Sequence, residues 1–490
     1  MSGHLWTAFE AAAATGGALC ARGGDPDDWS MEEWSARGLS IDTRTIRPGD
    51  IFVALKDARD GHDFVPKAFE AGASAALVSR ALDDAPDGAP LLMVGDTLTA
   101  LRDMAATARD RNFGKRIAVT GSAGKTSTKE MLRTILGACG ATHAADKSFN
   151  NHLGVPLTLA ALPMSADYSV FEIGMNHAGE ISPLTELVQP HAAIVTTVGE
   201  AHLEFFDSVE GIAEAKAEIF SGLRPGGAAV IPADNAHFAL LKRRAEKAGA
   251  RVVTFGEGEG ADYRLTSYAP DATGARLVAE IAGARIAFRI GASGRHQASN
   301  ALAALAAAEA VGADRDALIE AFAAAGPADG RGRRERLRFG DKRITLVDES
   351  YNANPASVRA ALSGLGEIAP DGAGRRVFIF GEMRELGPNA EALHAGLAGD
   401  VAAAGVGRLH AAGDMAKALH DAVPAEIRGE TADAALSLLD GILTDLQDGD
   451  VVMAKGSNAS RVGALVAALR DRAEPEDLPA DAAPSAPSTD

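Results

Sequence analysis

The fold of this chain is decided by one stretch of sequence, Arg116-Ile-Ala-Val-Thr-Gly-Ser-Ala-Gly-Lys-Thr-Ser-Thr-Lys-Glu-Met131. Its apolar, β-branched beginning predicts a strand that ends at Thr120, and the apolar residues from Met131 onward predict a helix that begins just beyond Lys125. Between them, Gly121 and Gly124 let the backbone turn so that N–H groups and the helix N-terminus face one point, where negative charge is favoured. The stretch therefore predicts a phosphate-binding loop.

The side chains that follow the second glycine suit the same chemistry. Lys125 supplies a mobile cation, and Thr126 supplies a hydroxyl suited to a phosphate-bound Mg²⁺. Only two residues separate the glycines, whereas the general P-loop motif has four. The alternative is a tight turn whose Lys and Thr are merely solvated, but strand, glycines, Lys and Thr all stand in the expected context. We assign the nucleotide phosphates to Gly121, Ser122, Ala123, Gly124, Lys125, Thr126 and Ser127.

Composition indicates an acidic globular protein. The chain has 490 residues, of which 47% are hydrophobic, enough for the cores of two to four domains. The net charge of −19 argues against nucleic-acid binding through a general basic surface, so local Arg, Lys and helix ends must hold any anionic substrate. Cys20 and Cys139 are too few for a disulfide framework or a thiolate metal site, which fits a reducing cytosol. We therefore expect a cytoplasmic protein.

Neither a membrane span nor a leader is predicted. The sequence contains no run of about 18 apolar residues. The Ala-rich stretch after Phe9 lies next to Glu10 and follows no basic segment, so it predicts a helix and not a signal peptide. We expect a monomer.

Alternating strand and helix signals predict an α/β protein of three domains, residues 1–112, 113–330 and 331–473. The last boundary falls in a polar, Gly- and Arg-rich stretch around residue 330. After Arg472 the composition shifts to Pro, Ala, Ser, Asp and Glu, which is too poor in apolar groups to fold. We therefore predict a disordered tail over residues 474–490.

Three side chains of the middle domain stand where ligands are expected. Glu172 ends an apolar strand, where a carboxylate can hold a Mg²⁺ that bridges phosphates. His202 lies in the loop after the next apolar strand, although a lone His in a loop is more often structural. Asp207 and Glu210 are spaced like a capping box and predict the start of a helix that carries Lys216 on an apolar face. By spacing alone, the stem of Lys216 could simply extend along that face.

Outside these positions the residues leave the choice between structure and function open. Thr43 and Arg44 fall on a loop of the first domain and are equally well read as surface groups. Asn300, near a helix start, is as consistent with a structural role as with ligand binding. In the last domain three strands end in polar loops, at residues 345–355, 377–387 and 451–457, which together predict a ligand-facing rim.

From the residues alone we conclude that the chain is an ATP-dependent, Mg²⁺-using enzyme whose substrate is not fixed. Its motifs, however, resemble successive motifs of the Mur ligases, which build the peptide of the peptidoglycan precursor. The resemblance covers nearly the whole chain except the tail. It is carried in the middle domain by Thr120-Gly-Ser-Ala-Gly-Lys-Thr126, Glu172 with Asn176-His177, Gly199-Glu-Ala-His202, Lys216 in Ala-Lys-Ala-Glu-Ile-Phe, and Gly294-Arg-His-Gln-Ala-Ser-Asn300. It is carried in the outer domains by Asp42-Thr-Arg44, Asp60-Gly-His-Asp-Phe64, Ser350-Tyr-Asn-Ala-Asn-Pro355, Gly381-Glu-Met-Arg-Glu-Leu-Gly387 and Lys455-Gly-Ser457.

The resemblance implies a domain that binds the UDP-sugar, a central P-loop ATPase domain and a Rossmann-like C-terminal domain. It also implies ligation through an acyl phosphate. The outer-domain motifs are most similar to the branch that adds D-alanyl-D-alanine to UDP-N-acetylmuramoyl-tripeptide (UDP-MurNAc-tripeptide), because the Asp-Asn-Pro-Arg motif of the tripeptide-forming branch is absent. Glu349 and Glu382 depart from the Asp that is more usual there, and Gln297 and Ala298 replace Asn-Ile. Whether the tripeptide ends in diaminopimelate or lysine stays open.

The resemblance also assigns roles to residues. Thr126 and Glu172 would hold a first Mg²⁺, His202 a second, and Lys216 would be carbamylated by CO₂, with Lys125, His202 and Lys216 the catalytic set. The nucleotide would contact Asn300 and Arg331. The UDP-sugar end would contact Thr43 and Arg44, and the dipeptide would contact Asn352, Asn354 and Pro355. Asn150, Asn176 and His177 would also bind substrate.

The motifs are compatible with three alternatives. A nucleotide-binding structural protein is the least favoured, because Glu172, His202 and Lys216 would then have no joint purpose. The second is another amide ligase of this superfamily, either the tripeptide-forming Mur ligase or a folylpolyglutamate synthase, and the long first domain argues against the latter. The third is a P-loop kinase or an ATPase switch, which would hydrolyse or transfer phosphate without needing an amine.

Overall fold

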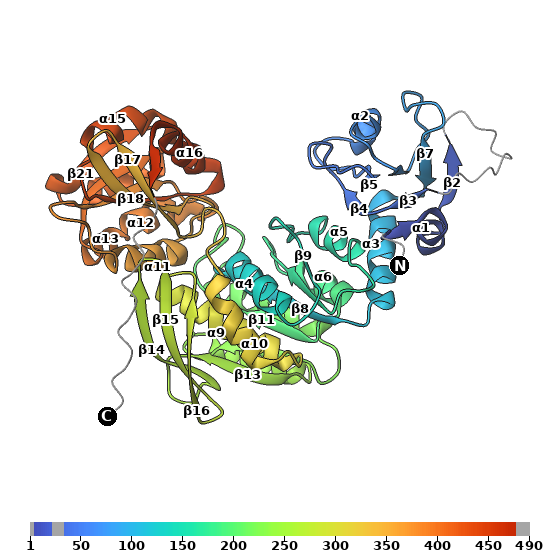
Figure 1. Cartoon of the computed structure of the whole chain (residues 1–490), viewed down its shortest axis with the longest axis horizontal. Helices are drawn as coiled ribbons and strands as arrows, with labels where there is room; N and C mark the ends of the chain where they lie inside the picture. The colour runs from blue at the N-terminus through green and yellow to red at the C-terminus, as the bar shows by residue number, and fades with distance from the viewer. Residues whose placement is uncertain (1–3, 22–33, 477–490) are drawn as a thin grey trace.

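Three large sheets, one in each domain, follow one another along the chain (Figure 1). The computed structural model describes residues 4–21 and 34–476. In Figure 1 the N-terminal and C-terminal domains lie on opposite sides of the central domain. The prediction of a three-domain α/β fold is confirmed. Among the described residues, no helix is long and apolar enough to cross a membrane.

The N-terminal domain has a five-stranded sheet and a small two-stranded one. The larger sheet runs β2 (Ala18–Ala21), β7 (Pro90–Met93), β6 (Ala75–Val78), β5 (Asp50–Val53) and β4 (Gly38–Ser40), and the smaller pairs β1 (Trp6–Thr7) with β3 (Ser35–Ala36). Its helices are α1 (Ala8–Thr15), α2 (Val65–Glu70) and α3 (Thr97–Arg111). Helix α3 shares one apolar cluster with the central domain, and the Trp6 indole N–H donates to Ala160 O at 2.9 Å. The first two domains are therefore joined by a continuous core.

The central domain is built on a nine-stranded, mostly parallel sheet within the described residues. Its order is β16 (Ala284–Ile290), β15 (Gly274–Ile281), β14 (Tyr263–Asp271), β13 (Arg251–Gly256), β12 (Ala228–Pro232), β11 (Ala192–Val195), β8 (Lys115–Thr120), β10 (Tyr168–Glu172) and β9 (Thr142–Ala144). Strand β8 lies between two parallel neighbours, and the chain reaches β10 on one side before β11 on the other. Such a switch point opens a ligand crevice at the carboxyl ends of the strands.

Helices cover both faces of this sheet because alternate strand residues point to opposite sides. Ile117 and Val119 join the cluster under α4 (Lys125–Gly137), α9 (Arg295–Ala310) and α10 (Arg315–Ala321). Ala118 joins the cluster on the other face, with α5 (Gly154–Ala160), α6 (Ile181–Val188), α7 (Val209–Ala217) and α8 (Phe238–Lys247). The apolar run that predicted a strand is thus a strand buried on both faces.

The C-terminal domain has a seven-stranded sheet in the described part of the chain, parallel except at one edge. The order is β21 (Arg428–Ala432), β20 (Val406–Ala412), β19 (Arg376–Gly381), β22 (Val451–Lys455), β18 (Lys342–Glu349), β17 (Arg333–Phe339) and β23 (Glu474–Glu476). Its helices are α11 (Pro355–Gly366), α12 (Ala390–Ala395), α13 (Ala398–Ala403), α14 (Asp414–Ala422), α15 (Leu439–Asp445) and α16 (Val462–Arg472).

Two local predictions were wrong. Ser208, not Asp207, caps α7, because the Ser208 hydroxyl accepts the N–H of Gly211, and the helix turns into a 3₁₀ segment at Glu218. The tail does not begin at residue 474, since β23 pairs with β17 and extends the sheet edge. Residues 477–490, the rest of the predicted tail, lie outside the described residues. The exact domain boundaries stay predictions.

Candidate active site

The phosphate loop joins β8 to α4 and depends on its two glycines. Gly121 has φ 151° and Gly124 has φ 82°, conformations that side chains rarely adopt. A Cβ at Gly121 would collide with the Thr196 hydroxyl, and one at Gly124 would lie 2.5 Å from Asn300 Oδ1. The predicted strand, loop and helix are all present, and the loop N–H groups stand at the N-terminus of α4.

Lys125 is the first residue of α4 and its ammonium group turns back over the loop. Its Nζ donates to Gly121 O at 2.7 Å. Burial lowers the pKa of Lys125 from its ordinary value, while the nearby Glu172 carboxylate opposes that shift. The ammonium therefore lies at the mouth of the loop, where it can donate hydrogen bonds to phosphate oxygens and offset their charge.

An oxygen-rich cluster stands beside Lys125. The Thr126 hydroxyl lies 2.8 Å from Glu172 Oε2 and 2.9 Å from Ser148 Oγ. The other oxygen of Glu172 accepts the Asn150 amide at 2.8 Å, and Arg331 donates to the Thr126 hydroxyl at 2.8 Å. Hydroxyl and carboxylate oxygens that leave room for phosphate oxygens are the donors that Mg²⁺ prefers. These residues fit the first predicted metal ion, although no group of three or more His, Cys, Asp and Glu gathers as a metal site among the described residues.

His202 and Lys216, the two other predicted catalytic residues, stand in different surroundings. His202 Nδ1 lies 2.6 Å from Glu385 Oε2, a residue of the C-terminal domain. Lys216 on α7 is buried and has no hydrogen bond or ion pair with any residue that the structure describes. Burial, and secondly repulsion from Lys125, hold the pKa of Lys216 well below its ordinary range. Lys216 is thus not an extended surface lysine.

One cavity of about 730 Å³ between the central and C-terminal domains is lined by Lys125, the oxygen cluster and His202, but not by Lys216. Most of the phosphate loop, with Thr126, Glu172, Ser148 and His202, lines its central-domain side. A further part of that wall lies beyond the ends of β12 and β13 and at the start of α9, and is formed by Asp234, Asn235, Phe255, Gly256, His296, Gln297 and Asn300. The C-terminal domain closes it with Glu349, Tyr351, Asn352, Asn354, Glu385 and Lys455.

The C-terminal wall is fastened to the central domain by its own side chains. Asn354 Nδ2 donates to Ser122 O of the phosphate loop at 3.0 Å, while Asn354 Oδ1 caps α11 by accepting the Ser357 N–H at 2.8 Å. Buried Lys455 donates to Glu349 Oε2 at 3.2 Å and to Asn352 O at 3.1 Å. Both ends of the Asn354 amide therefore serve the protein itself, which joins the phosphate loop to the start of α11.

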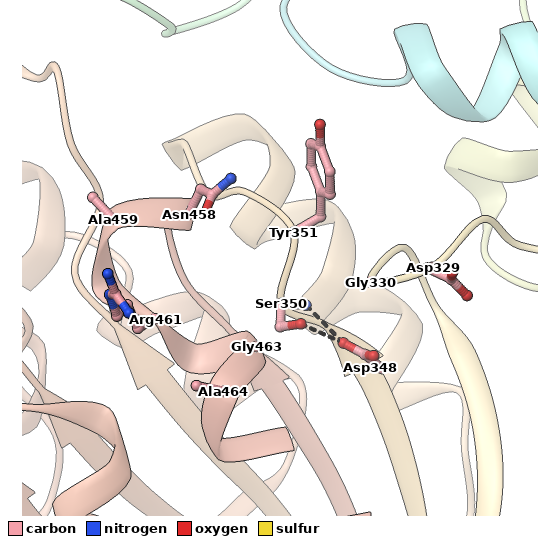
Figure 2. Close-up of a pocket in the computed structure, with 10 residues that line it drawn as sticks. All are labelled: Asp329, Gly330, Asp348, Ser350, Tyr351, Asn458, Ala459, Arg461, Gly463 and Ala464. Atoms are coloured by element: carbon pink, nitrogen blue, oxygen red, sulfur yellow. Dashed lines mark hydrogen bonds between the residues drawn. The ribbon is translucent and has the colours of Figure 1, made fainter. Parts of the chain in front are cut away.

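A second cavity, of about 520 Å³, adjoins the first and is shown in Figure 2. The two cavities share Gly330, Tyr351, Asn458 and Ala459. In Figure 2 the side chain of Arg461 stands at one end and that of Asp329 at the other, and Ser350 donates to Asp348 between them. Arg461 is exposed and forms no ion pair within the described ranges.

Comparisons with known proteins agree over nearly the whole chain. Three family models match, the Mur ligase family catalytic domain at residues 35–109, the Mur ligase middle domain at 119–308 and the Mur ligase glutamate ligase domain at 332–458. The UDP-N-acetylmuramoyl-tripeptide--D-alanyl-D-alanine ligase of Escherichia coli is 36% identical over 88% of this chain and 93% of its own length. The chain belongs to the Mur ligase family.

Other relatives support the same assignment. The enzyme of that name from Mycobacterium tuberculosis is 35% identical over 88% of this chain and 91% of its own. A crystal structure of MurF from Acinetobacter baumannii matches with a TM-score of 0.81 at 31% identity, covering 95% of this chain and 99% of that one. MurF ligase from Thermotoga maritima in complex with ADP has the same fold, with a TM-score of 0.74 at 24% identity over 89% of this chain and 97% of its own.

Some predicted substrate residues of this Mur ligase line neither cavity. Arg44 is paired with Asp42 at 2.6 Å and is 79% exposed, and Thr43 precedes it on the N-terminal domain. His177 pairs with Glu180 at 3.1 Å, whose other oxygen accepts the Asn176 N–H. Pro355 is buried as the first residue of α11. Thr43, Arg44, Asn176 and His177 therefore lie outside both cavities, and Pro355 lies under the wall between Asn354 and Ala356, which line the large one.

The sequence reasoning missed Ser148, Asp234 and Glu385. Ser148 lies two residues before Asn150, in a loop with no strand to announce it. Asp234 follows β12 and accepts the N–H groups of Glu257 and Gly258 at 2.5 and 2.9 Å, so its position at the carboxyl end of a parallel strand was a readable signal. Glu385 stood within a quoted motif, but its partner is 183 residues away.

Proposed function

We propose that this Mur ligase joins D-alanyl-D-alanine to UDP-MurNAc-tripeptide at the expense of ATP, which gives the pentapeptide precursor of peptidoglycan. The observation that supports this most directly is the cavity between the central and C-terminal domains. It has a phosphate loop and an oxygen cluster on one wall and the motif loops of the C-terminal domain on the other. Relatives that carry this enzyme name extend over most of the chain.

The chemistry explains why two walls are needed. A carboxylate is a poor electrophile until one of its oxygens leaves as phosphate. Transfer of the γ-phosphoryl group of ATP to the tripeptide carboxylate forms an acyl phosphate and ADP. The dipeptide amine then attacks the acyl carbon, the tetrahedral intermediate expels phosphate, and the amine loses a proton. Lys125 and the N–H groups of the loop stabilise the negative charge that is redistributed during phosphoryl transfer.

Metal binding is assigned to the oxygen cluster of Thr126, Glu172 and Ser148. Mg²⁺ held there would neutralise charge on the phosphates of ATP. The buried Lys216 suits carbamylation, because a lowered pKa leaves more neutral amine to attack CO₂, which forms a carbamate and releases one proton. The carbamate would turn this cation into an anion that helps to hold a second ion with His202.

Substrate placement follows from the cavities. Asn300 and Arg331, which line the large cavity, are assigned to the nucleotide. The small cavity opens beside Asn352, and its free Arg461 suits the carboxylate end of the dipeptide. The UDP end of the other substrate is assigned to the N-terminal domain, where Thr43 and Arg44 lie. We propose that the enzyme is active as a monomer.

The decisive experiment measures phosphate release from ATP and Mg²⁺ with UDP-MurNAc-tripeptide, with and without D-alanyl-D-alanine. We expect release that requires both substrates, together with a product of the pentapeptide mass. L-alanyl-L-alanine is the matched control and should give little release. Phosphate release that ignores the dipeptide would refute the proposal and point to an ATPase or to a ligase for a single amino acid, which a screen of amino acids would separate.

A further inference from the structure

The contact between His202 and Glu385 links two domains at the edge of the large cavity. Nδ1 of the histidine and Oε2 of the glutamate are 2.6 Å apart, and both residues line the cavity that contains Lys125 and Thr126. The backbones of the two loops are also in contact, since the Glu204 N–H donates to Glu385 O at 3.2 Å. A Cβ on Gly387 would lie 3.3 Å from Glu204 Cα, so the two loops approach closely.

Both residues of the pair have unusual backbones. His202 has φ 57° and Glu385 has φ 61°, the left-handed region that costs a side-chain-bearing residue about 1 kcal/mol or more. Only five such residues other than glycine occur in the part of the chain that the structure describes, and two of them face one another here. Strained residues of this kind persist where their surroundings hold them, and they concentrate at functional sites.

The hydrogen bond decides which ring nitrogen of His202 is available. With Nδ1–H donating to the carboxylate, Nε2 carries the free lone pair. Metal-binding histidines commonly use the second ring nitrogen in this way, and a carboxylate on the first fixes the ring and makes the ligand more basic. In this chain the carboxylate belongs to Glu385 of the C-terminal domain, whereas His202 belongs to the central domain. The orientation of the histidine ring therefore depends on the contact between the two domains.

We propose that Glu385 is a positioning residue that fixes His202 as a metal ligand only when the C-terminal domain is docked. Domain closure then completes the second metal position. By linkage, the free energy by which closure strengthens metal binding equals the free energy by which metal binding favours the closed form. Closure is supported by two further contacts across the same interface, Arg359 to Glu200 at 2.8 Å and Asn354 to Ser122. The inference rests on the proposed function only in assigning the second ion to an ATP-using site.

The test measures ion binding and not turnover. Mn²⁺ is titrated into the enzyme with a non-hydrolysable ATP analogue, and the bound ions are counted by electron paramagnetic resonance. We expect two Mn²⁺ sites in the parent, and Glu385→Ala should weaken the second by roughly 10- to 100-fold. Glu385→Gln, which keeps an acceptor but removes the charge, should fall between them. Glu391→Gln, an exposed glutamate in the following helix, is the matched control and should bind as the parent does.

Two further measurements separate positioning from simple domain fastening. His202→Ala should lose the second site, and adding Glu385→Ala to it should cost nothing more, since both act through one ligand. Small-angle X-ray scattering should show that Mn²⁺ compacts the parent but not Glu385→Ala. Unchanged Mn²⁺ affinity in Glu385→Ala, with or without a loss of compaction, would overturn the proposal, and so would two intact sites in His202→Ala. No dipeptide is present, so a failure here is distinct from a failure to ligate D-alanyl-D-alanine.

Discussion

The two walls of the large cavity are built in different ways. On the central-domain wall, a single run of residues from Gly121 to Thr126 supplies backbone N–H groups, a cation and a hydroxyl, and its shape follows from two glycines. On the C-terminal wall, two of the side chains contact the other domain, Asn354 at Ser122 O and Glu385 at His202, while Lys455 holds Glu349 inside its own domain. The first wall is set largely by local sequence, and the second is completed only when the domains dock.

The largest expected effect concerns the central wall alone. Lys125→Ala removes the cation that stabilises charge during phosphoryl transfer, which costs about 3 to 4 kcal/mol and lowers kcat by roughly 10²- to 10³-fold or more. Lys115→Ala, an exposed lysine at the other end of β8, should leave kcat unchanged. Steady-state phosphate release measures both variants, and near-normal turnover in Lys125→Ala would remove the phosphate-loop assignment.

A smaller effect is expected where the walls meet. Asn354→Asp keeps an oxygen that can cap α11 but replaces the amide that donates to Ser122 O with a carboxylate oxygen, which cannot donate and is repelled by the carbonyl oxygen. We expect kcat/KM for D-alanyl-D-alanine to fall about tenfold while the free energy of unfolding in urea stays within about 0.5 kcal/mol of the parent. Asn354→Ala should also lose about 1 kcal/mol of stability because it removes the cap. A lower stability in Asn354→Asp, with unchanged kinetics, would show that the residue is only a cap.

The same contrast decides what could be predicted from the sequence. The strand, turn and helix around Lys125 follow from apolar spacing and glycine, and so does Glu172 at the end of β10, because each depends on neighbours in the chain. Asn354 was assigned to the dipeptide. Its place directly before Pro355 is typical of an N-cap, but nothing in its local sequence indicates that its amide nitrogen donates to Ser122 O. Glu385 was missed for the same reason. Contacts between domains depend on docking geometry, which composition and periodicity do not encode.

The cap of α7 shows a subtler limit. Asp207 with Glu210 and Ser208 with Gly211 are both acceptable beginnings, since Asp and Ser are nearly equal as N-caps. In the structure the Ser208 hydroxyl makes the cap. Lys216 lies one turn after Ile212 on the same buried face whichever residue caps the helix. N-cap propensity alone therefore does not fix the first residue of the helix.

Arg461 tests the C-terminal wall separately, because it lines the small cavity, which no residue of the phosphate loop lines. Arg461→Ala should raise KM for D-alanyl-D-alanine about tenfold, the value of one exposed charge-assisted hydrogen bond, and leave KM for ATP unchanged. Arg472→Ala, at the far end of the same helix, is the control. An equal rise in both KM values would mean that the residue supports the fold of the wall and does not contact the dipeptide.

The last comparison concerns stability in acid, away from catalysis, and involves the cores behind the two walls. Half-buried His191 and buried His410 each accept a backbone N–H at Nδ1, from Arg116 and Glu430, and desolvation lowers the pKa of each to about 4. Above about pH 6.5 both are neutral whether folded or unfolded, so they contribute no pH dependence. As the pH falls from about 6.5 to about 4 the unfolded chain takes up protons that the folded chain refuses, so stability falls, and below about pH 4 these groups cause no further loss.

His410→Gln should therefore reduce the acid sensitivity of the C-terminal domain. The glutamine oxygen can accept the Glu430 N–H but cannot be protonated in this range, and the parent loses at most roughly 3 kcal/mol through His410 between pH 7.5 and 4.5. Urea unfolding at the two pH values gives the difference directly, and exposed His4→Gln is the control. The titration of carboxylates that do not contact His410 is common to parent and variant and cancels, and Asp445, 3.5 Å from His410 Nε2, is the exception. If His410→Gln destabilises the protein equally at the two pH values, the imidazole acts by packing alone and the prediction is wrong.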